Sequence, residues 1–181
     1  MTAEAWWRTS IIDIRPGEIR IRGYAIEELI GRVSFPAMIW LMARGGLPAP
    51  AQAALLEAAL VAAVDHGPHA PSIAVARMTA TCGVPLNVAV ASGVNALGDV
   101  HGGAGEQCMA LYAEVASAAD FDAAARESVE RRLAAGRLIE GFGHRFHPVD
   151  PRSVRLKARV ADAARAGTVS GRFLAVAEAV E

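Results

Sequence analysis

Apolar residues recur at the spacing of α-helices through most of this chain, and glycine and proline interrupt that spacing repeatedly. Alanine, the strongest helix former, is abundant, whereas aromatic residues make up only 6% of the sequence. With 53% hydrophobic residues, the 181-residue chain can bury a core, which excludes intrinsic disorder and disfavours an all-β fold. We therefore predict an all-α, multi-helical fold.

One segment departs from the helical spacing. Ser10 to Arg22 contains two short isoleucine-rich runs on either side of Arg15-Pro16-Gly17-Glu18, which is the pattern of a β-hairpin. No other segment carries a comparable strand signal, so we predict a single small N-terminal β-hairpin.

Glycine, proline and capping residues mark where the predicted helices begin and end. After the hairpin we expect two helices separated by a break near Gly31, and then an almost uncharged helix from Pro50 to Val64 that should be covered on most sides. Ser72 is the expected cap of a helix that runs to about Cys82. Further helices are expected through Cys108 to Val115, over 121–135, from Pro151 to near Gly167, and from Ser170 onward.

Charge and cysteine usage limit the possible partners. The formal net charge is −1 and Lys157 is the only lysine, so the chain has no basic footprint for nucleic acid. Cys82 and Cys108 are far apart in sequence and follow no secretory signal, which indicates reduced thiols in the cytoplasm. The longest uncharged run, Met78 to Gly98, contains proline, asparagine and glycine, so we interpret it as buried helices and not as a membrane span.

All five histidines fall in three loops rich in glycine and proline: Asp65 to Ser72, His101 to Glu106, and Gly141 to Arg152. Loops held by a rigid scaffold often carry function, and a histidine can donate or accept a proton near neutral pH. The opposing interpretation is that histidine is simply well tolerated in loops.

Each loop allows both a functional and a structural interpretation. Asp65, His66 and His69 have a spacing that could bind a metal, although a fourth ligand is missing. The glycines after His101 could bring backbone N–H groups to a ligand, or could form an ordinary tight turn. Arg152 could hold a carboxylate through two hydrogen bonds, or could lie in solvent at the start of a helix.

Two enzyme classes are disfavoured by spacing. Gly141-Phe142-Gly143 lacks the third glycine of a dinucleotide fingerprint, and no phosphate-binding P-loop motif occurs. A serine hydrolase is also disfavoured, because the chain has no Gly-x-Ser-x-Gly motif and too few strands.

Four segments stand out when they are taken in chain order: Gly17 to Leu29, Asp65-His66 with Pro71-Ser72, Asp99 to Glu106, and Gly141 to Arg145 with Asp150-Pro151-Arg152. Together they span residues 17 to 152 and resemble motifs of the citrate synthase superfamily. Between Leu47-Pro48 and Asp65-His66 the chain has room for only a single helix, where full-length citrate synthases carry a much longer helical segment. This compact form resembles the short citryl-CoA lyases and the citryl-CoA lyase module of ATP-citrate lyase.

The resemblance implies roles for individual residues. His101 would polarise the thioester carbonyl of an acyl-CoA, and His144 would hydrogen-bond the carbonyl or hydroxyl of oxaloacetate or a citryl group. His66 and Arg152 would bind the dicarboxylate. The segment that would cradle the adenine of coenzyme A consists of Leu138, Ile139, Glu140, Gly141, Phe142 and Gly143.

The resemblance also implies an acyltransferase or lyase that makes or breaks a carbon–carbon bond between acetyl-CoA and oxaloacetate, or between related compounds. The coenzyme A thioester is then a substrate, and no tightly bound cofactor or metal is expected. We expect residues 1–100 to form part of a large, dimerising helical domain, and 101–181 to begin the small coenzyme A-binding domain. A homodimer would cover the apolar helices between Pro50 and Gly98.

The sequence also departs from the family pattern. The family's catalytic aspartate belongs to a segment downstream of Glu181. Asp150 belongs to the Asp-Pro-Arg motif, where it is the expected cap of the helix from Pro151, and Asp120 and Asp122 start a helix, so all three are poor substitutes. The alternative hypothesis is therefore a truncated or degenerate chain that binds coenzyme A without turnover and needs a C-terminal segment or a partner.

Overall fold

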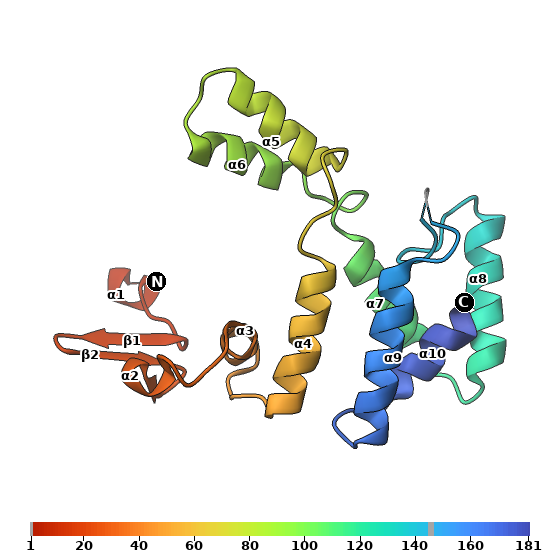
Figure 1. The fold of residues 1–181 in the computed structure, drawn as a ribbon, viewed down its shortest axis with the longest axis horizontal. Coiled ribbons are helices and arrows are strands. Elements are labelled where there is room, and N and C mark those ends of the chain that lie inside the picture. Colours follow the sequence, from red (N-terminus) through yellow and green to blue (C-terminus); the bar gives the residue numbers. More distant parts are fainter. Residues whose placement is uncertain (1, 145–146) are drawn as a thin grey trace. The chain divides into compact units, whose positions relative to one another are not determined.

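The computed structural model describes residues 2–144 and 147–181 (Figure 1). By its internal contacts the chain divides into two compact units, which run up to Val61 and from Ala62 to Glu181. Helices dominate both units, which confirms the predicted all-α class with one small sheet. The division predicted at residue 100 concerns the two domains of the family and stays a prediction.

The first unit contains the predicted hairpin. Strands β1 (Ile12–Arg15) and β2 (Glu18–Ile21) pair antiparallel, with Arg15 opposite Glu18. Proline and glycine form the two-residue turn, where Gly17 adopts a φ of +77° that favours glycine.

A third strand, β3 (Tyr24–Ala25), pairs antiparallel with β2 and was not predicted. The connection is the two-residue turn Arg22-Gly23, in which both residues have positive φ values of +49° and +89°. Turns of this kind usually begin with asparagine, aspartate or glycine, so arginine at the first position gave no signal in the sequence.

Four helices complete the first unit: α1 (Ala3–Trp6), α2 (Ile26–Leu29), α3 (Phe35–Arg44) and α4 (Pro50–Ala62). The predicted break near Gly31 is confirmed, and Ser34 caps α3 by accepting a hydrogen bond from the Ala37 N–H. No residue of α4 is buried. The expectation that α4 is covered on most sides is therefore not met by the described part of this chain, because its apolar side chains surround the helix and find few neighbours.

The second unit begins with a helical hairpin of α5 (Pro71–Thr81) and α6 (Leu86–Asn95), separated by a break that contains Gly83 and Pro85. The two helices pack closely at Gly93, where a Cβ atom would lie 2.8 Å from the Ser72 carbonyl oxygen. The prediction that Ser72 caps α5 is wrong: Ala70 occupies the cap position and Pro71 is the first helical residue. Proline favours that position because it has no N–H to leave unpaired.

The remaining helices are α7 (Ala104–Ala116), α8 (Phe121–Ala134), α9 (Pro151–Arg165) and α10 (Arg172–Val180) (Figure 1). Helix α10 contacts the other three, and Leu111, Val115 and Val176 are fully buried in the core formed by α7, α8 and α10. Asp150 caps α9 with Pro151 at the first helical position, as the sequence predicted.

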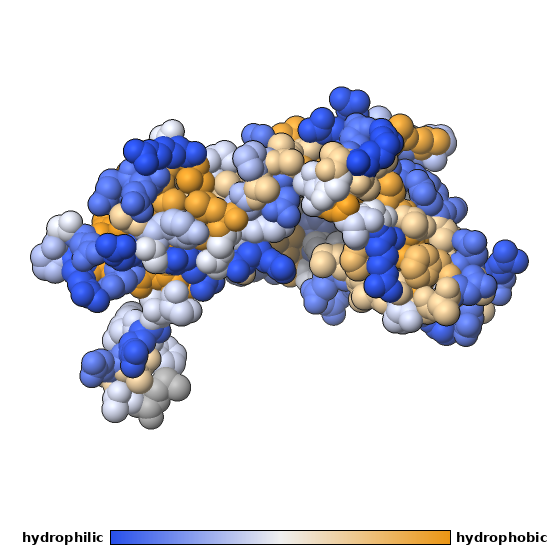
Figure 2. All heavy atoms as spheres, turned by 90° about the horizontal axis from the view of Figure 1, so that it is seen from below, coloured by the Kyte–Doolittle hydropathy of each residue, from blue (hydrophilic) through white to orange (hydrophobic). Residues whose placement is uncertain are grey.

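Many large hydrophobic side chains remain at the surface, and Figure 2 shows such residues in orange. On the α5–α6 hairpin they include Val75, Met78, Leu86, Val88, Val90 and Val94. The uncharged run from Met78 to Gly98 is divided between two helices, and none of the helices within 2–144 and 147–181 is long and apolar enough to cross a membrane.

Candidate active site

His101 lies in a tight turn between α6 and α7. The Gly98 N–H donates to the His101 carbonyl over 2.8 Å, and the Gly103 N–H donates to the Gly98 carbonyl over 3.0 Å. Gly102 has a φ of +111°, and a Cβ on Gly103 would lie only 2.7 Å from the Asp99 carbonyl oxygen. Both positions therefore require glycine, and the turn fixes the backbone position from which the His101 side chain projects.

The His101 ring is held from the start of α5. Its Nε2 atom lies 3.1 Å from the backbone nitrogen of Ser72 and 2.9 Å from the Ser72 hydroxyl oxygen. An amide N–H can only donate, so Nε2 accepts and carries no proton of its own, which leaves the proton of the neutral ring on Nδ1. Sequence reasoning missed this role of Ser72, because the two residues are 29 positions apart and meet only in the folded unit.

Three of the predicted substrate residues come together around one open depression of about 390 Å³. His66 belongs to the loop before α5, His144 to the loop before α9, and Arg152 to the first turn of α9. The depression is also lined by His69, His147, Asp65, Asp150 and Pro151. His101 is not among its lining residues, although its partner Ser72 follows directly from the loop that carries His66. Arg145, the motif residue after His144, lies outside the described residues.

The histidines of this depression outnumber its carboxylates, and both carboxylates are already engaged. Asp65 accepts a hydrogen bond from the Gly67 N–H over 2.9 Å, and Asp150 is bonded to Arg152. The rings of His144 and His147 stack with centroids 4.6 Å apart and planes inclined by 28°. The depression therefore offers imidazole and guanidinium groups, which suit an anionic ligand.

Arg152 is held in place by a neighbouring carboxylate. Its Nε and Nη2 atoms donate to the two carboxylate oxygens of Asp150 over 3.0 and 2.6 Å. The guanidinium in turn holds the pKa of the Asp150 carboxyl well below its usual range, mainly through these hydrogen bonds.

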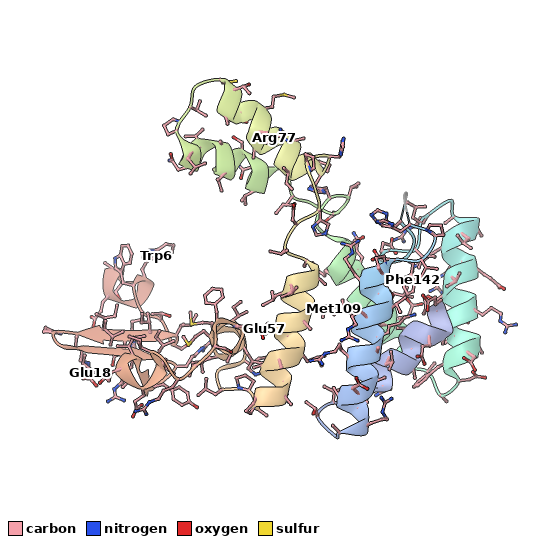
Figure 3. The ribbon with its side chains drawn as sticks, viewed as in Figure 1. Trp6, Glu18, Glu57, Arg77, Met109 and Phe142 are labelled. Atoms are coloured by element: carbon pink, nitrogen blue, oxygen red, sulfur yellow. The ribbon has the colours of Figure 1, made fainter. Side chains whose placement is uncertain are left out.

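The predicted coenzyme A segment divides into a packed part and an exposed part. Ile139 and Phe142, the latter labelled in Figure 3, pack against the core of α7, α8 and α10. The Phe142 ring meets Tyr112 edge-on with centroids 6.2 Å apart. Glu140 receives a hydrogen bond from Arg137 over 2.6 Å, whereas Leu138 is 85% exposed.

Gly141 and Gly143, together with Phe142, line a second cavity of about 220 Å³ between this segment, α9 and α10. Gly141 has a φ of +86°, and a Cβ there would lie 2.7 Å from the Cys108 sulfur. The segment therefore passes directly over α7, at a position where only glycine fits.

The metal alternative has no geometric support in the part of the chain that the structure describes. Within 2–144 and 147–181, no three histidine, cysteine, aspartate or glutamate side chains form a group that could hold a metal ion.

Comparison with known proteins defines the class. The profile of the citrate synthase C-terminal domain matches residues 42–181. The chain is 29% identical to the citrate synthase of Acidithiobacillus ferridurans over 76% of its length, and 35% identical to that of Haloferax volcanii over 65%. The chain therefore belongs to the citrate synthase family, and the resemblance predicted from the four motifs is confirmed.

Solved structures refine the comparison. Citryl-CoA lyase from Hydrogenobacter thermophilus superposes with a TM-score of 0.80 at 38% identity, and the match covers 96% of this chain and 66% of that one. ATP citrate lyase of Methanosaeta concilii, solved in complex with (3S)-citryl-CoA, shares the fold with a TM-score of 0.83 at 23% identity. The chain spans about a third of the length of the curated relatives, at 35% and 31% of the two citrate synthases.

Proposed function

We propose that this chain acts on citryl-CoA or a closely related compound, and cleaves or forms the carbon–carbon bond between an acyl-CoA and a keto acid such as oxaloacetate. One observation carries the proposal: His66, His144 and Arg152, from separate parts of the sequence, line one depression in a member of the citrate synthase family. The 38% identity to a citryl-CoA lyase supports the lyase direction.

The reaction creates negative charge on the thioester oxygen, which needs a hydrogen-bond donor. When citryl-CoA is cleaved, the bond between the hydroxyl-bearing carbon and the methylene group beside the thioester breaks. The hydroxyl loses its proton and becomes the ketone of oxaloacetate, while the bonding electrons pass into the thioester and form an enolate. That enolate takes up a proton at carbon to give acetyl-CoA.

In this scheme His101 stabilises the enolate. Its Nδ1–H would donate a hydrogen bond to the thioester oxygen as negative charge develops there. Ser72 supports the role, because its amide occupies Nε2 and thereby keeps the ring proton on the opposite nitrogen. We assign the exchange of the proton at the acetyl carbon to none of the described residues.

The other residues of the depression suit the keto acid. Arg152 and His66 would bind its carboxylates, and His144 would hydrogen-bond its ketone or hydroxyl oxygen. We assign the adenine of coenzyme A to the segment from Leu138 to Gly143, which passes over α7 and borders the second cavity. The coenzyme A thioester is a substrate in this proposal, and no tightly bound cofactor takes part.

We further propose that the protein is a cytoplasmic homodimer. Leu86 is 79% exposed and Met78 is 71% exposed on the α5–α6 hairpin, and α4 has no buried residue, so a second copy would remove this apolar surface from water. Cys82 and Cys108 are both free, which is consistent with a reducing compartment.

The proposal is tested by adding citryl-CoA to the purified chain and coupling oxaloacetate release to NADH oxidation. We expect activity in the wild type and a loss of orders of magnitude in His101→Ala, with unchanged helix content by circular dichroism. Leu133→Ala serves as a matched control for the catalytic step, because this side chain of α8 is 59% exposed and has no assigned role in binding or catalysis.

The same samples decide between the enzyme and a chain that only binds. Calorimetry measures coenzyme A binding. Binding without cleavage would favour the hypothesis of a chain that only binds, which the partial coverage of the relatives motivates. Equal rates for wild type and His101→Ala would contradict the role assigned to His101.

A further inference from the structure

Among the described residues, the guanidinium of Arg152 hydrogen-bonds to a carboxylate through only one of its two edges. A guanidinium can bind a carboxylate side-on, through Nε and one Nη, or end-on, through both Nη atoms. Asp150 occupies the side-on edge with bonds of 3.0 and 2.6 Å. The Nη1 atom of Arg152 makes no hydrogen bond to another described residue. Arg152 also lines the depression.

Asp150 is itself anchored by the backbone. Its Oδ1 atom accepts the Arg152 backbone N–H over 2.9 Å, which caps the first turn of α9. Pro151, the first helical residue, restricts the backbone between the two. The carboxylate therefore serves the helix and the guanidinium at once, and it cannot leave the guanidinium freely without uncapping α9.

We propose that Asp150 is a positioning residue, which occupies the side-on edge of Arg152 and thereby directs the end-on edge toward a ligand carboxylate in the depression. The ligand class is a dicarboxylate, so this inference rests on the proposed function. A free arginine side chain would lose rotamer entropy on binding, whereas this one is already fixed in place before the ligand arrives.

The opposite role would be that of a competitor. Asp150 would then mimic the ligand carboxylate and would have to be displaced before binding. The side-on geometry and the backbone anchor favour positioning, because the end-on edge stays accessible while the pair remains intact.

The test separates the helix cap from the clamp on the guanidinium. Asp150→Ser keeps a good capping oxygen but is too short to hold both nitrogens of Arg152, and Asp150→Asn keeps the cap and one acceptor. Asp120→Ser is the matched control, because Asp120 caps α8 by accepting the Ala123 N–H over 3.0 Å and lines no part of this depression.

Oxaloacetate and coenzyme A binding are measured separately by calorimetry for the full chain. We expect Asp150→Ser to bind oxaloacetate about tenfold more weakly, with Asp150→Asn in between and coenzyme A binding unchanged in both. Asp120→Ser should bind both ligands like the wild type. Unchanged oxaloacetate binding in Asp150→Ser would overturn the proposal, and tighter binding would identify Asp150 as a competitor.

A second readout needs no ligand. The Nε–H of Arg152 should give a proton-exchange-protected NMR signal in the wild type, assigned by its loss in Arg152→Lys, and the protection should disappear in Asp150→Ser. A protected signal in a chain that does not bind oxaloacetate would count against the proposed function. An unprotected signal in a chain that does bind it would overturn the clamp alone.

Discussion

The backbone nitrogen of Ser72 lies 3.1 Å from the Nε2 atom of His101, and this contact joins the first turn of α5 to the glycine-rich turn before α7. The contact depends on close packing of α5 and α6, because a side chain at Gly93 would collide with the Ser72 carbonyl oxygen. A small residue on one helix thus helps to set the tautomer of a histidine in a distant loop.

This contact predicts the protonation of the ring. In the wild type at a pH where His101 is neutral, its ¹⁵N NMR shifts should show a protonated Nδ1 and an unprotonated Nε2. Ser72→Ala removes the hydroxyl but keeps the amide, so the same tautomer should persist while citryl-CoA cleavage falls by roughly tenfold through looser positioning. A switch to a protonated Nε2 in the wild type would contradict the assignment.

Gly141 should tolerate no side chain. Gly141→Ala places a Cβ 2.7 Å from the Cys108 sulfur at a φ of +86°, so we expect a loss of about 2–3 kcal/mol in the free energy of unfolding and weaker coenzyme A binding. Gly143→Ala is the control, because Gly143 also has a positive φ but has open space around its Cα.

Chemical denaturation and calorimetry measure both effects. The backbone strain alone should cost Gly143→Ala about 1 kcal/mol. Equal losses in the two variants would show that the contact with Cys108 is unimportant.

The two cysteines should differ in reactivity. Burial raises the pKa of the Cys108 thiol above its ordinary value of 9.0, whereas Cys82 is exposed. Because the thiolate is the nucleophile, iodoacetamide should modify Cys82 first at about pH 8, and modification of Cys108 should increase only as the pH rises further. Peptide mass spectrometry over a pH series measures both rates, and faster labelling of Cys108 would contradict the prediction.

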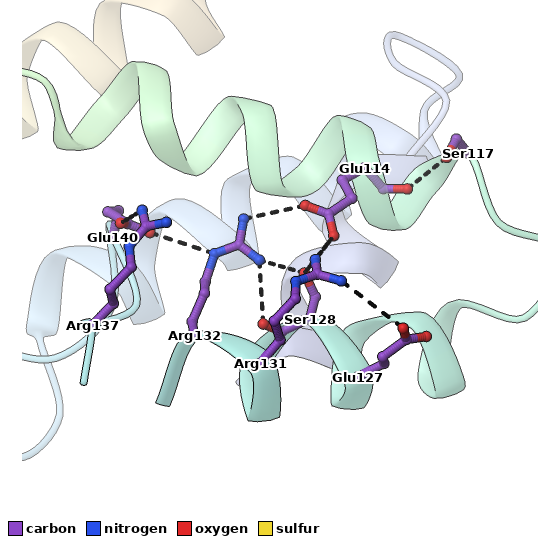
Figure 4. Close-up of polar contacts among 8 residues, drawn as sticks. All are labelled: Glu114, Ser117, Glu127, Ser128, Arg131, Arg132, Arg137 and Glu140. Carbon is purple, nitrogen blue, oxygen red and sulfur yellow. Dashed lines mark hydrogen bonds and ion pairs between the residues drawn. The ribbon is translucent and has the colours of Figure 1, made fainter. Parts of the chain in front are cut away.

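Glu114 connects α7 to α8 and should make the stability depend on acid pH. It accepts a hydrogen bond from the buried Ser128 hydroxyl over 2.7 Å and pairs with Arg131 and Arg132 (Figure 4). These bonds lower its pKa below the ordinary value of 4.5. Because the folded-state pKa is the lower one, this stabilisation is present above the unfolded-state pKa and is lost as the pH falls through the folded-state pKa.

Glu114→Gln should therefore be less stable than the wild type at neutral pH, and the difference should shrink on acidification below about pH 4. Urea unfolding at several pH values measures it. Glu127→Gln is the control, because that side chain is 81% exposed and lies 3.9 Å from Arg131. A difference between wild type and Glu114→Gln that stays constant with pH would contradict the prediction.

The core between α7, α8 and α10 should dominate the stability of the second unit. Leu111 is fully buried, so Leu111→Ala should lower the free energy of unfolding by about 2–5 kcal/mol. Met109 lies on the same helix and is 72% exposed (Figure 3), so Met109→Ala should change it by less than about 0.5 kcal/mol. Comparable losses would show that this core is not the stabilising one.

The sequence by itself determined turns, helix breaks and helix caps that depend on neighbouring residues. The turn at Pro16-Gly17, the break near Gly31 and the cap at Asp150 depend on residues within a few positions of one another, and all three were predicted. The family was predicted too, because its motifs are short runs of adjacent residues.

Contacts between distant residues were decided only by the tertiary structure. Ser72 has the chemistry of a helix cap, yet helix packing gives it to His101 instead. Arg152 and His66 are far apart in the sequence, and only the tertiary structure brings both to one depression. Local propensity fixes where a helix begins, whereas the direction of a side chain depends on what the rest of the chain packs against it.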